Sequence, residues 1–318
     1  MKTRVLVTGA AGFGGSHLVD YLIQDDSLEV FGTKRWGEST ENLIQSLDKM
    51  TLIDCDFTDM HSVEYALFEA YPNFIIHLAA QSFVPYSYSA PIATMQSNVI
   101  GTLNLLESCL NYGPDKLVLV TSSEVYGQVE ANEVPIIEAQ PFRPVSPYGV
   151  SKVAQDMAGF MYWKAYNLPI VRLRPFTFTG PRQNEGLACS AFARQIALIE
   201  KGKQPPEIRV GNLDSVRTFC DVRDMVRAFW MARGLPPGEV YNVGGLTTMM
   251  VGDMLNHLLL LSKVPNIKIV QDPRLLRPAD VTLQIPYSEK FRAATGWKEE
   301  HQFDETLVSL LDYWRSKI

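Results

Sequence analysis

The stretch V-T-G-A-A-G-F-G-G at residues 7–15 limits what the rest of the chain can form. It follows a short apolar run at 4–7 and leads into a helical pattern at 14–24. Its glycines are spaced three residues apart, at Gly9, Gly12 and Gly15. Glycine lets such a turn close tightly and lets backbone amides approach a pyrophosphate at the start of a helix. A tight turn without a ligand is the alternative, but the strand–turn–helix context favours dinucleotide binding.

The first half of the chain alternates short apolar runs with helical patterns. Runs typical of buried strands lie at 4–7, 29–32, 51–53, 74–76 and 117–121, and helical patterns lie at 14–24, 61–70, 92–112 and 146–167. Continuous apolar runs are typical of strands covered on both faces, and this alternation produces parallel βαβ units. We therefore predict an α/β fold with a doubly wound parallel sheet, a Rossmann domain over residues 1–175 that binds NADP.

The second half of the chain has a less regular pattern of predicted helices and strands. After a strand at 170–173, residues 175–186 are rich in turn formers. Further helical patterns lie at 187–201, 222–233, 250–262 and 304–315, with strands at 208–210 and 239–242. We predict that residues 176–318 mainly form a smaller substrate-binding lobe, and that roughly residues 211–245 return to the sheet.

Composition excludes several classes of function. The formal net charge of −6 provides no basic surface for nucleic acid, and no apolar run is long enough to span a bilayer. The cysteines are scattered without a CxxC pair, at Cys55, Cys109, Cys189 and Cys220. Neither they nor the histidines show metal-ligand spacing, so we expect no metal. The N-terminus lacks a signal-peptide pattern, so we expect a cytoplasmic protein.

The end of the second strand indicates which dinucleotide binds. An NAD-binding sheet usually offers an acid here to the ribose hydroxyls, but this chain has Lys34 and Arg35. Two cations suit a 2′-phosphate, so we predict NADP rather than NAD, the alternative being a solvated basic pair. Asp56 follows the third strand and either hydrogen-bonds the adenine or caps the next helix.

The stretch S-P-Y-G-V-S-K at 146–152 carries a second chemical pattern. Ser146 can cap a helix that begins at Pro147, which puts Tyr148 and Lys152 one turn apart on one face. A phenol titrates near 10, so its use at neutral pH requires its phenolate to be favoured by about 4 kcal/mol. We expect the ammonium of Lys152, together with a positively charged nicotinamide, to favour the phenolate.

Polar residues also follow the fifth strand. Ser122, Ser123 and Glu124 lie at its carboxyl end, where ligands of doubly wound sheets bind. We expect Ser122 to hydrogen-bond the sugar oxygen that Tyr148 deprotonates. Removal of a carbon-bound proton needs a further base, which Glu124 can supply. The alternative for Glu124 is a strand-end carboxylate that is solvated or paired with a lysine.

Four motifs resemble the extended short-chain dehydrogenase/reductase family: T-G-x-x-G-x-x-G at 8–15, H-L-A-A-Q-S at 77–82, a serine ahead of Y-x-x-x-K, and R-P at 174–175. The resemblance covers nearly the whole chain. Within the family, S-S-E-V-Y-G, G-T-K-R, V-G-N-L-D-S-V-R-T-F-C-D-V-R-D-M-V-R-A and L-L-R-P-A-D-V resemble the branch that acts on GDP-hexoses. That branch contains GDP-mannose 4,6-dehydratase and the reductase of its 4-keto product.

The resemblance implies a set of site residues. Catalytic roles would fall to Ser122, Glu124, Tyr148 and Lys152. Cofactor contacts would come from Thr8, Gly9, Gly12, Phe13, Gly15, Lys34, Arg35, Asp56, Phe57, Leu78, Ala79, Ala80, Tyr148, Lys152 and Pro175. Substrate contacts would come from Gln81, Ser123, Thr177, Arg182, Asn212, Arg217 and Arg277, with the last two holding the diphosphate.

The resemblance also implies a reaction, although the chain departs from the family pattern. Thr177 and Phe178 stand where Asn and His are usual, and Leu187-Ala188-Cys189 replaces F-V-T, which alters the substrate wall. We expect a GDP-mannose 4,6-dehydratase acting on a GDP-linked sugar as a homodimer or homotetramer. The alternatives are an NADPH-dependent 4-ketoreductase of the dehydratase product, a nucleotide-sugar epimerase, and an NADP-binding regulatory protein without turnover.

Overall fold

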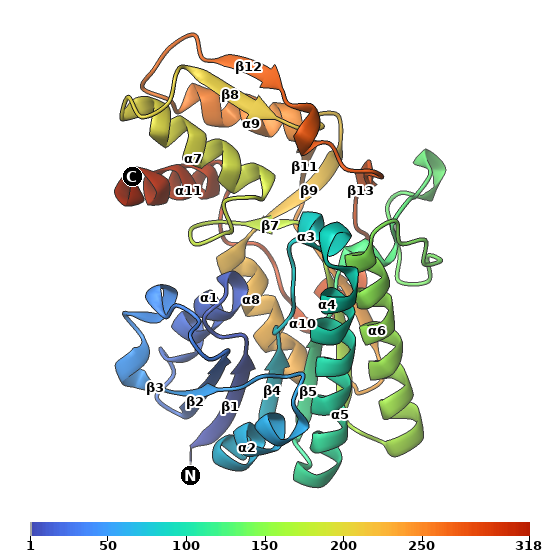
Figure 1. Ribbon diagram of the computed structural model, residues 1–318. Helices are drawn as coiled ribbons and strands as arrows, with labels where there is room; N and C mark the ends of the chain where they lie inside the picture. The colour runs from blue at the N-terminus through green and yellow to red at the C-terminus, as the bar shows by residue number, and fades with distance from the viewer. Residues whose placement is uncertain (1) are drawn as a thin grey trace.

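The computed structural model describes residues 2–318, and a seven-stranded parallel sheet forms the centre of its larger part (Figure 1). The strands are β1 (Thr3–Thr8), β2 (Leu28–Lys34), β3 (Met50–Asp54), β4 (Phe74–His77), β5 (Lys116–Val120), β6 (Ile170–Pro175) and β10 (Val240–Val243). Their order is β3-β2-β1-β4-β5-β6-β10. The chain therefore reverses its direction across the sheet between β1 and β4, where ligands of such sheets bind. The predicted doubly wound fold is confirmed.

Helices cover both faces of this sheet because its side chains alternate between two apolar cores. Val5 and Val7 pack into one core with α1 (Phe13–Leu22), α8 (Val222–Met231) and α10 (Glu289–Thr295). Leu6 points into the other core with α2 (Met60–Ala70), α5 (Gly101–Tyr112) and α6 (Pro147–Tyr166). This period of two is the strand periodicity, and burial on both faces accounts for the continuous apolar runs.

The predicted helix at 92–112 is divided. It consists of α4 (Pro91–Met95), a π-helical turn at Gln96–Ile100 and α5, and it follows a short helix α3 (Val84–Ser89) that was not predicted. Short 3₁₀ turns occur at Glu41–Leu43, Leu47–Lys49, Ser123–Val125, Ala131–Glu133, Ala232–Gly234 and Pro273–Leu275. The π turn contains the fully buried Asn98, and such turns occur frequently at functional sites.

A smaller lobe lies over the carboxyl ends of the strands (Figure 1). Its core is formed by α7 (Ala188–Glu200), α9 (Val251–Leu260) and α11 (Phe303–Lys317). β8 (Glu207–Val210) pairs with β12 (Lys268–Gln271). β9 (Val216–Asp221) pairs with β7 (Phe178–Thr179), β11 (Thr247–Met250) and β13 (Leu283–Gln284). The lobe helices match the predicted ones, whereas β7, β9, β11, β12 and β13 were not predicted.

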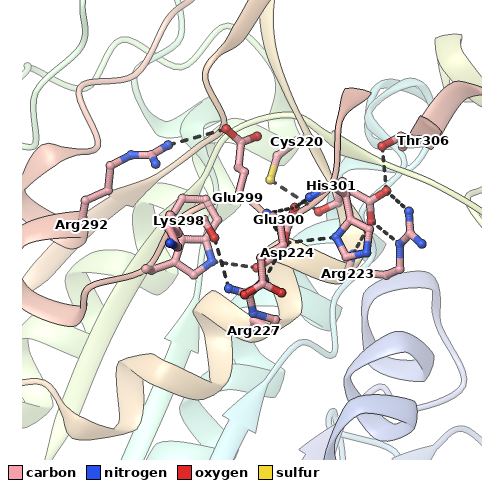
Figure 2. A network of polar contacts seen from close by, with 12 residues as sticks. Cys220, Arg223, Asp224, Arg227, Arg292, Lys298, Glu299, Glu300, His301 and Thr306 are labelled. Carbon is pink, nitrogen blue, oxygen red and sulfur yellow. Dashed lines mark hydrogen bonds and ion pairs between the residues drawn. The ribbon is translucent and has the colours of Figure 1, made fainter. Parts of the chain in front are cut away.

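A buried polar network joins α8 to the segment that leads into α11 (Figure 2). The carboxylate of Asp224 is fully buried and accepts the backbone N–H groups of Glu300, at 3.1 Å, and His301, at 3.0 Å. Asp221 caps α8 and also accepts the hydroxyl of Thr306 at 2.7 Å. These contacts attach the lobe to the sheet. Over residues 2–318, none of the helices combines the length and the apolar character that a membrane span requires.

Candidate active site

The glycine loop forms a cradle that only glycine permits. Gly9 has a φ of +68°, and a Cβ there would lie 3.0 Å from the Cα of Ala79. A Cβ on Gly15 would lie 2.1 Å from the carbonyl oxygen of Gly9. Gly12 is the N-cap of α1, and neither a side-chain cap nor an acid in the first turn competes for the free amides. The cradle therefore fits the pyrophosphate of a dinucleotide.

Thr8, a predicted cofactor contact, joins two strands of the sheet. Its side chain is fully buried, and its hydroxyl accepts the backbone N–H groups of Leu78 at 3.1 Å and Ala79 at 3.0 Å. It also lies 2.9 Å from Nδ1 of His77, whose pKa burial lowers to about 3, so that this ring stays neutral. Thr8 thus ties β1 to the end of β4, and its contact with the cofactor stays a prediction. Leu78, Ala79 and Ala80 stay partly exposed beside the glycine loop.

The two cations after β2 are not equivalent. Lys34 forms an ion pair with Asp54, its neighbour across β2 and β3. The side chain of Arg35 is 78% exposed, and its closest acid is Glu38, with the Nε–Oε2 distance at 3.8 Å. Of these two cations, only Arg35 can therefore bind a phosphate without breaking a close ion pair.

Asp56 does not cap the next helix, so that alternative is wrong. Its carboxylate accepts the backbone N–H of Thr58 at 2.9 Å and the hydroxyl of the same residue at 2.8 Å. The cap of α2 is Asp59, which accepts the backbone N–H of His61 at 3.1 Å. Asp56 remains exposed at the end of β3, and the ring of the neighbouring Phe57 lies 5.4 Å from that of His77.

Tyr148 and Lys152 meet at the start of α6 as their spacing predicts. The hydroxyl of Ser146 accepts the backbone N–H of Gly149 at 2.9 Å and caps the helix. Both side chains are buried, with exposed fractions of 8% and 4%, and Nζ of Lys152 lies 5.8 Å from the centre of the Tyr148 ring. The same Nζ donates to the carbonyl of Val120, at the end of β5, at 3.4 Å.

Burial controls the ionisation of this pair. It raises the pKa of the Tyr148 phenol above its ordinary value, and a hydrogen bond with Ser122 only partly opposes this. It lowers the pKa of Lys152 to about 7. In the protein alone, desolvation therefore outweighs the hydrogen bond from Ser122, and the expected effect of Lys152 together with a bound nicotinamide stays a prediction.

Glu124 follows β5 on the same side of the sheet. Its backbone N–H donates to Oγ of Ser122 at 3.1 Å, which links it to the serine that contacts Tyr148. Its carboxylate accepts from Nε2 of Gln284 at 3.4 Å, so its partner is an amide and not a lysine. Burial raises the pKa of Glu124, and the positive charges of Arg277 and Arg217 partly oppose the rise. A carboxyl with a raised pKa can act as both acid and base near neutral pH.

A polar group in the lobe is centred on Asp280, a residue that the sequence did not single out. Nδ2 of Asn212 donates to its carboxylate at 2.7 Å. Arg217, on β9, lies 3.9 Å from the same carboxylate, and Arg277 lies 3.7 Å from it. The structure therefore brings together three of the predicted substrate residues. Asp280 lies in the L-L-R-P-A-D-V motif, which is the signal that could have identified it.

Other predicted substrate residues lie elsewhere. Arg182 does not join the Asp280 group, because its guanidinium pairs with Asp20 on α1 at 2.7 Å. Thr177 is partly exposed just after β6, and Ser123 is buried. Pro175, expected at the cofactor, is a buried residue of β6. Arg182 therefore lies outside the Asp280 group, and its contact with the substrate stays a prediction.

Asn98 is a residue that sequence reasoning missed. Its side chain accepts the backbone N–H of Gln81 at 2.7 Å and donates to the carbonyl of Gln81 at 3.0 Å. It also donates to Ser151 at 2.9 Å, and the Ser151 hydroxyl donates to the carbonyl of Tyr148 at 2.7 Å. The loop after β4 is thereby fixed to α6. The side-chain amide of Gln81, a predicted substrate contact, is itself bonded to Thr94 at 3.2 Å.

Phe13 and Phe178 close the side of the glycine loop. Phe13 begins α1, and its ring stacks on that of Phe178 in β7 with centroids 5.4 Å apart. Phe178 replaces a histidine of the family pattern, so the contact here is apolar. Within residues 2–318, the four cysteines are buried and unpaired, and no cluster of His, Cys, Asp and Glu could hold a metal ion.

The chain is similar to known proteins over nearly its whole length. The family model described as GDP-mannose 4,6 dehydratase matches residues 6–310. A GDP-6-deoxy-D-mannose reductase of Pseudomonas aeruginosa is 31% identical, and the alignment covers 100% of this chain and 99% of the relative. A GDP-mannose 4,6-dehydratase of Vibrio cholerae is 28% identical, with 98% and 93% covered.

Solved structures agree with the fold. The RMD structure from Pseudomonas aeruginosa complexed with NADPH has a TM-score of 0.84 at 29% identity, covering 99% of this chain and 100% of that one. The UDP-glucose 4-epimerase of Thermus thermophilus in complex with NAD has a TM-score of 0.89 at 30% identity, with the same coverage. A nicotinamide dinucleotide is thus the cofactor class of the similar proteins.

Proposed function

Because the chain belongs to the GDP-mannose 4,6-dehydratase family of extended short-chain dehydrogenases/reductases, we propose that it converts GDP-mannose to GDP-4-keto-6-deoxymannose through bound NADP. The observation that carries this proposal is a second titratable group beside the phenol. Ser122 contacts both Tyr148 and Glu124, and the charge of Glu124 acts on the phenol. Transfer of a hydride to or from a C–OH carbon needs one proton-transfer group, whereas elimination of water needs another.

The cradle of Gly9, Gly12 and Gly15 would hold the dinucleotide, which when bound supplies the hydride acceptor for C4 and the hydride donor for C6. Tyr148 takes the proton of the C4 hydroxyl, and Ser122 hydrogen-bonds the same oxygen. Glu124 takes the proton from C5 and gives it to the hydroxyl that leaves C6 as water. When C6 accepts the hydride, the proton that Tyr148 took from O4 is delivered to C5, which restores both side chains. The raised pKa of Glu124 suits a carboxyl that must accept and then donate a proton.

The substrate phosphates are assigned to the lobe. We propose that Arg217 and Arg277 bind the diphosphate of a GDP-linked sugar, because two guanidinium groups converge there beside Glu124. Asp280 and Asn212 would orient them. The cofactor is proposed to be NADP because the side chain of Arg35 is 78% exposed and its ion pair with Glu38 is long, at 3.8 Å.

A second activity is favoured by one observation. The alignment with the Pseudomonas aeruginosa reductase runs from end to end at 31% identity. In an NADPH-dependent reductase of the 4-keto sugar, Tyr148 donates a proton to the C4 oxygen, and Glu124 has no carbon-bound proton to remove. The two activities therefore differ in their need for Glu124.

The deciding experiment supplies purified protein with GDP-mannose and no reductant. A dehydratase gives an alkali-sensitive 4-keto product, whereas a reductase consumes NADPH only when the keto sugar is added. Glu124→Gln should abolish dehydration and leave dinucleotide affinity unchanged, while Glu69→Gln, an exposed carboxyl on α2, should have no effect. An unaltered dehydration rate in Glu124→Gln would remove Glu124 from the mechanism, and turnover of neither sugar would contradict both activities.

We also propose a homodimer, or a tetramer built from it, through α5 and α6. These helices expose large apolar side chains at fractions of 38% to 45%: Ile100, at the junction with α5, Leu110, Val150, Met157, Phe160 and Met161. Apolar groups of this number on adjacent helices are typical of an interface. Light scattering should give a dimer, and Phe160→Glu with Met157→Glu should give a monomer; a monomeric wild type would contradict this.

A further inference from the structure

A mostly exposed strap carries Arg277, one of the two arginines that we propose bind the diphosphate. The strap is formed by residues 273–282, which lie between β12 and β13. Asp272, just before the strap, donates its backbone N–H to β8 at 2.8 Å, and the carbonyl of Thr282 accepts a backbone N–H from β9 at 2.8 Å. The strap is therefore part of the lobe, and its distance from the sheet depends on contacts across the site.

The side chain of Tyr88, on α3, links the strap to the larger part of the molecule. Its hydroxyl lies 3.3 Å from the carbonyl of Ala279 in the strap. It also lies 2.9 Å from the carbonyl of Val145, which precedes Ser146, the N-cap of α6. A hydroxyl carries a single proton, so the two carbonyls share one donor. Tyr88 thus joins α3, the strap and the start of the helix that carries Tyr148.

The charges around Tyr88 come from both sides of the site. Burial raises the pKa of Tyr88 above its ordinary value; the positive charge of Arg277 opposes this rise, and the negative charges of Glu124 and Asp280 add to it. The phenol therefore keeps its proton at neutral pH and remains a donor to the two carbonyls. Tyr88 is close enough to the proposed base and to the proposed diphosphate residue to be affected by both.

The two arginines depend on the strap to different degrees. The guanidinium of Arg217 donates to the carbonyl of its neighbour Val216 at 3.1 Å and also to the carbonyl of Val281, so hydrogen bonds of its own orient it. The ion pair between Arg277 and Asp280 is long, with an Nη1–Oδ1 distance of 3.7 Å, and both residues belong to the strap. The place of Arg277 in the site is therefore set mainly by where the backbone of the strap lies.

We infer that Tyr88 is a positioning residue: its hydroxyl holds the strap, and with it Arg277, close enough to α6 for one nucleoside-diphosphate sugar to contact both. The inference rests on the proposed function, in which Arg277 binds the diphosphate, and it applies to the dehydratase and the reductase alike. Loss of one neutral hydrogen bond that orients such a group should weaken binding roughly fivefold.

The test measures the affinity for GDP by calorimetry, because GDP carries the diphosphate and lacks the sugar that reacts. Tyr88→Phe keeps the ring and removes the hydroxyl, so it should bind GDP roughly fivefold more weakly than the wild type and leave the Kd for NADP unchanged. Tyr86→Phe, which alters an exposed tyrosine on the same helix, is the matched control and should bind GDP as the wild type does.

A double-mutant cycle distinguishes positioning through Arg277 from a direct contact between Tyr88 and the ligand. Arg277→Met should itself weaken GDP binding. Adding Tyr88→Phe to that variant should change the Kd by less than about twofold, because Tyr88 then has no phosphate-binding group to position. In steady-state kinetics, Tyr88→Phe alone should raise KM for the nucleotide sugar and change kcat by less than about twofold.

Unchanged GDP affinity in Tyr88→Phe would overturn the inference. So would an equal loss in the Arg277→Met background, which would mean that Tyr88 acts independently of Arg277, and so would a wild type that does not bind GDP. Failure of the proposed function is seen separately: a chain whose GDP affinity depends on Tyr88 through Arg277, but which turns over neither GDP-mannose nor its keto product, would keep the positioning contact and lack the proposed activity.

Discussion

The two sides of the candidate active site are built in different ways. Tyr148 and Lys152 lie one helical turn apart on α6, so the helix alone sets their separation. Arg217, Arg277 and Asp280 come from β9 and from the proline-broken segment before β13, and only the folding of the lobe brings them together. The first side is a local arrangement and the second is a tertiary one.

Because the two sides are built differently, we expect them to have different functions in the site. The α6 side is buried and lies at the carboxyl end of β5, where ligands of such sheets bind. The lobe side offers guanidinium groups that suit phosphates remote from the reacting carbons. Substitutions on the two sides should therefore change different kinetic constants.

The largest effect is expected at the phenol. Tyr148→Phe should lower kcat about 10³-fold, because it removes the group that we propose exchanges a proton with the C4 oxygen. KM and the Kd for the dinucleotide should stay within about threefold in steady-state kinetics and calorimetry. Tyr166→Phe, on the exposed end of the same helix, serves as the control and should match the wild type. A normal kcat in Tyr148→Phe would contradict the assignment of proton transfer to the α6 side of the site.

The lobe side should show the opposite pattern. Arg217→Met should raise KM for the nucleotide sugar about 10²-fold with kcat changed less than about threefold, because a charge-assisted contact to phosphate binds ground state and transition state alike. Arg217→Lys should recover only part of the loss, since an ammonium cannot form a paired fork. Arg209→Met, an exposed arginine on β8, is the control. A loss confined to kcat would place Arg217 with the reacting groups instead.

A smaller effect separates the two cations after β2. Arg35→Ala should weaken NADP about tenfold and leave NAD nearly unchanged, because its guanidinium is the one free to engage a phosphate. Lys34→Ala should weaken NADP less, since its ammonium is already paired with Asp54. Calorimetric titration of each variant with both dinucleotides checks this. Equal losses for NADP and NAD would leave the choice of NADP without support.

The smallest effect is a gain in stability. Burial lowers the pKa of Lys152 from its ordinary 10.5 to about 7, so between these values the unfolded chain holds the proton more tightly than the folded one. The folded wild type is therefore penalised in full below about pH 7, and the penalty is relieved as the pH rises towards 10.5. Lys152→Met should raise Tm by a few degrees at pH 7, and the gain should shrink by pH 10.

Scanning calorimetry of both proteins across that pH range measures the difference. Lys164→Met, near the end of the same helix, controls for the loss of a lysine as such. A Tm gain that did not depend on pH would mean that methionine packing, and not the buried charge, is responsible. The variant should also lose turnover. A more stable but inactive variant would indicate that the buried charge of Lys152 lowers the stability of the fold and is needed for the reaction.

The sequence predicted the parts of the fold that have long local patterns. The strands of the seven-stranded sheet lie within a few residues of their predicted positions, because burial on both faces leaves continuous apolar runs. The helices that cover the sheet were also predicted, except α10, which lies in the proline-broken segment. Among the strands of the lobe, β8 was predicted and the others were missed. β7 and β13 span two residues each, and β12 is exposed, so none has a run of buried residues to detect.

Among the site residues, local register and backbone constraint could be derived from the chain alone. The capped start of α6 places Tyr148 beside Lys152, and the glycine spacing creates a cradle that a Cβ would fill. The first follows from the geometry of one helical turn, and the second from the positive φ of Gly9 and the close approach of Gly15 to Gly9 within the loop.

Only the tertiary structure decided which partners the charged and polar groups have. It pairs Lys34 with Asp54 across two strands, and Glu124 with Gln284 from a segment 160 residues away. It also buries Thr8 between β1 and β4. A pKa depends on desolvation and on nearby charges, and a hydrogen bond on groups within about 3 Å, so both depend on neighbours that only the packing of distant segments supplies.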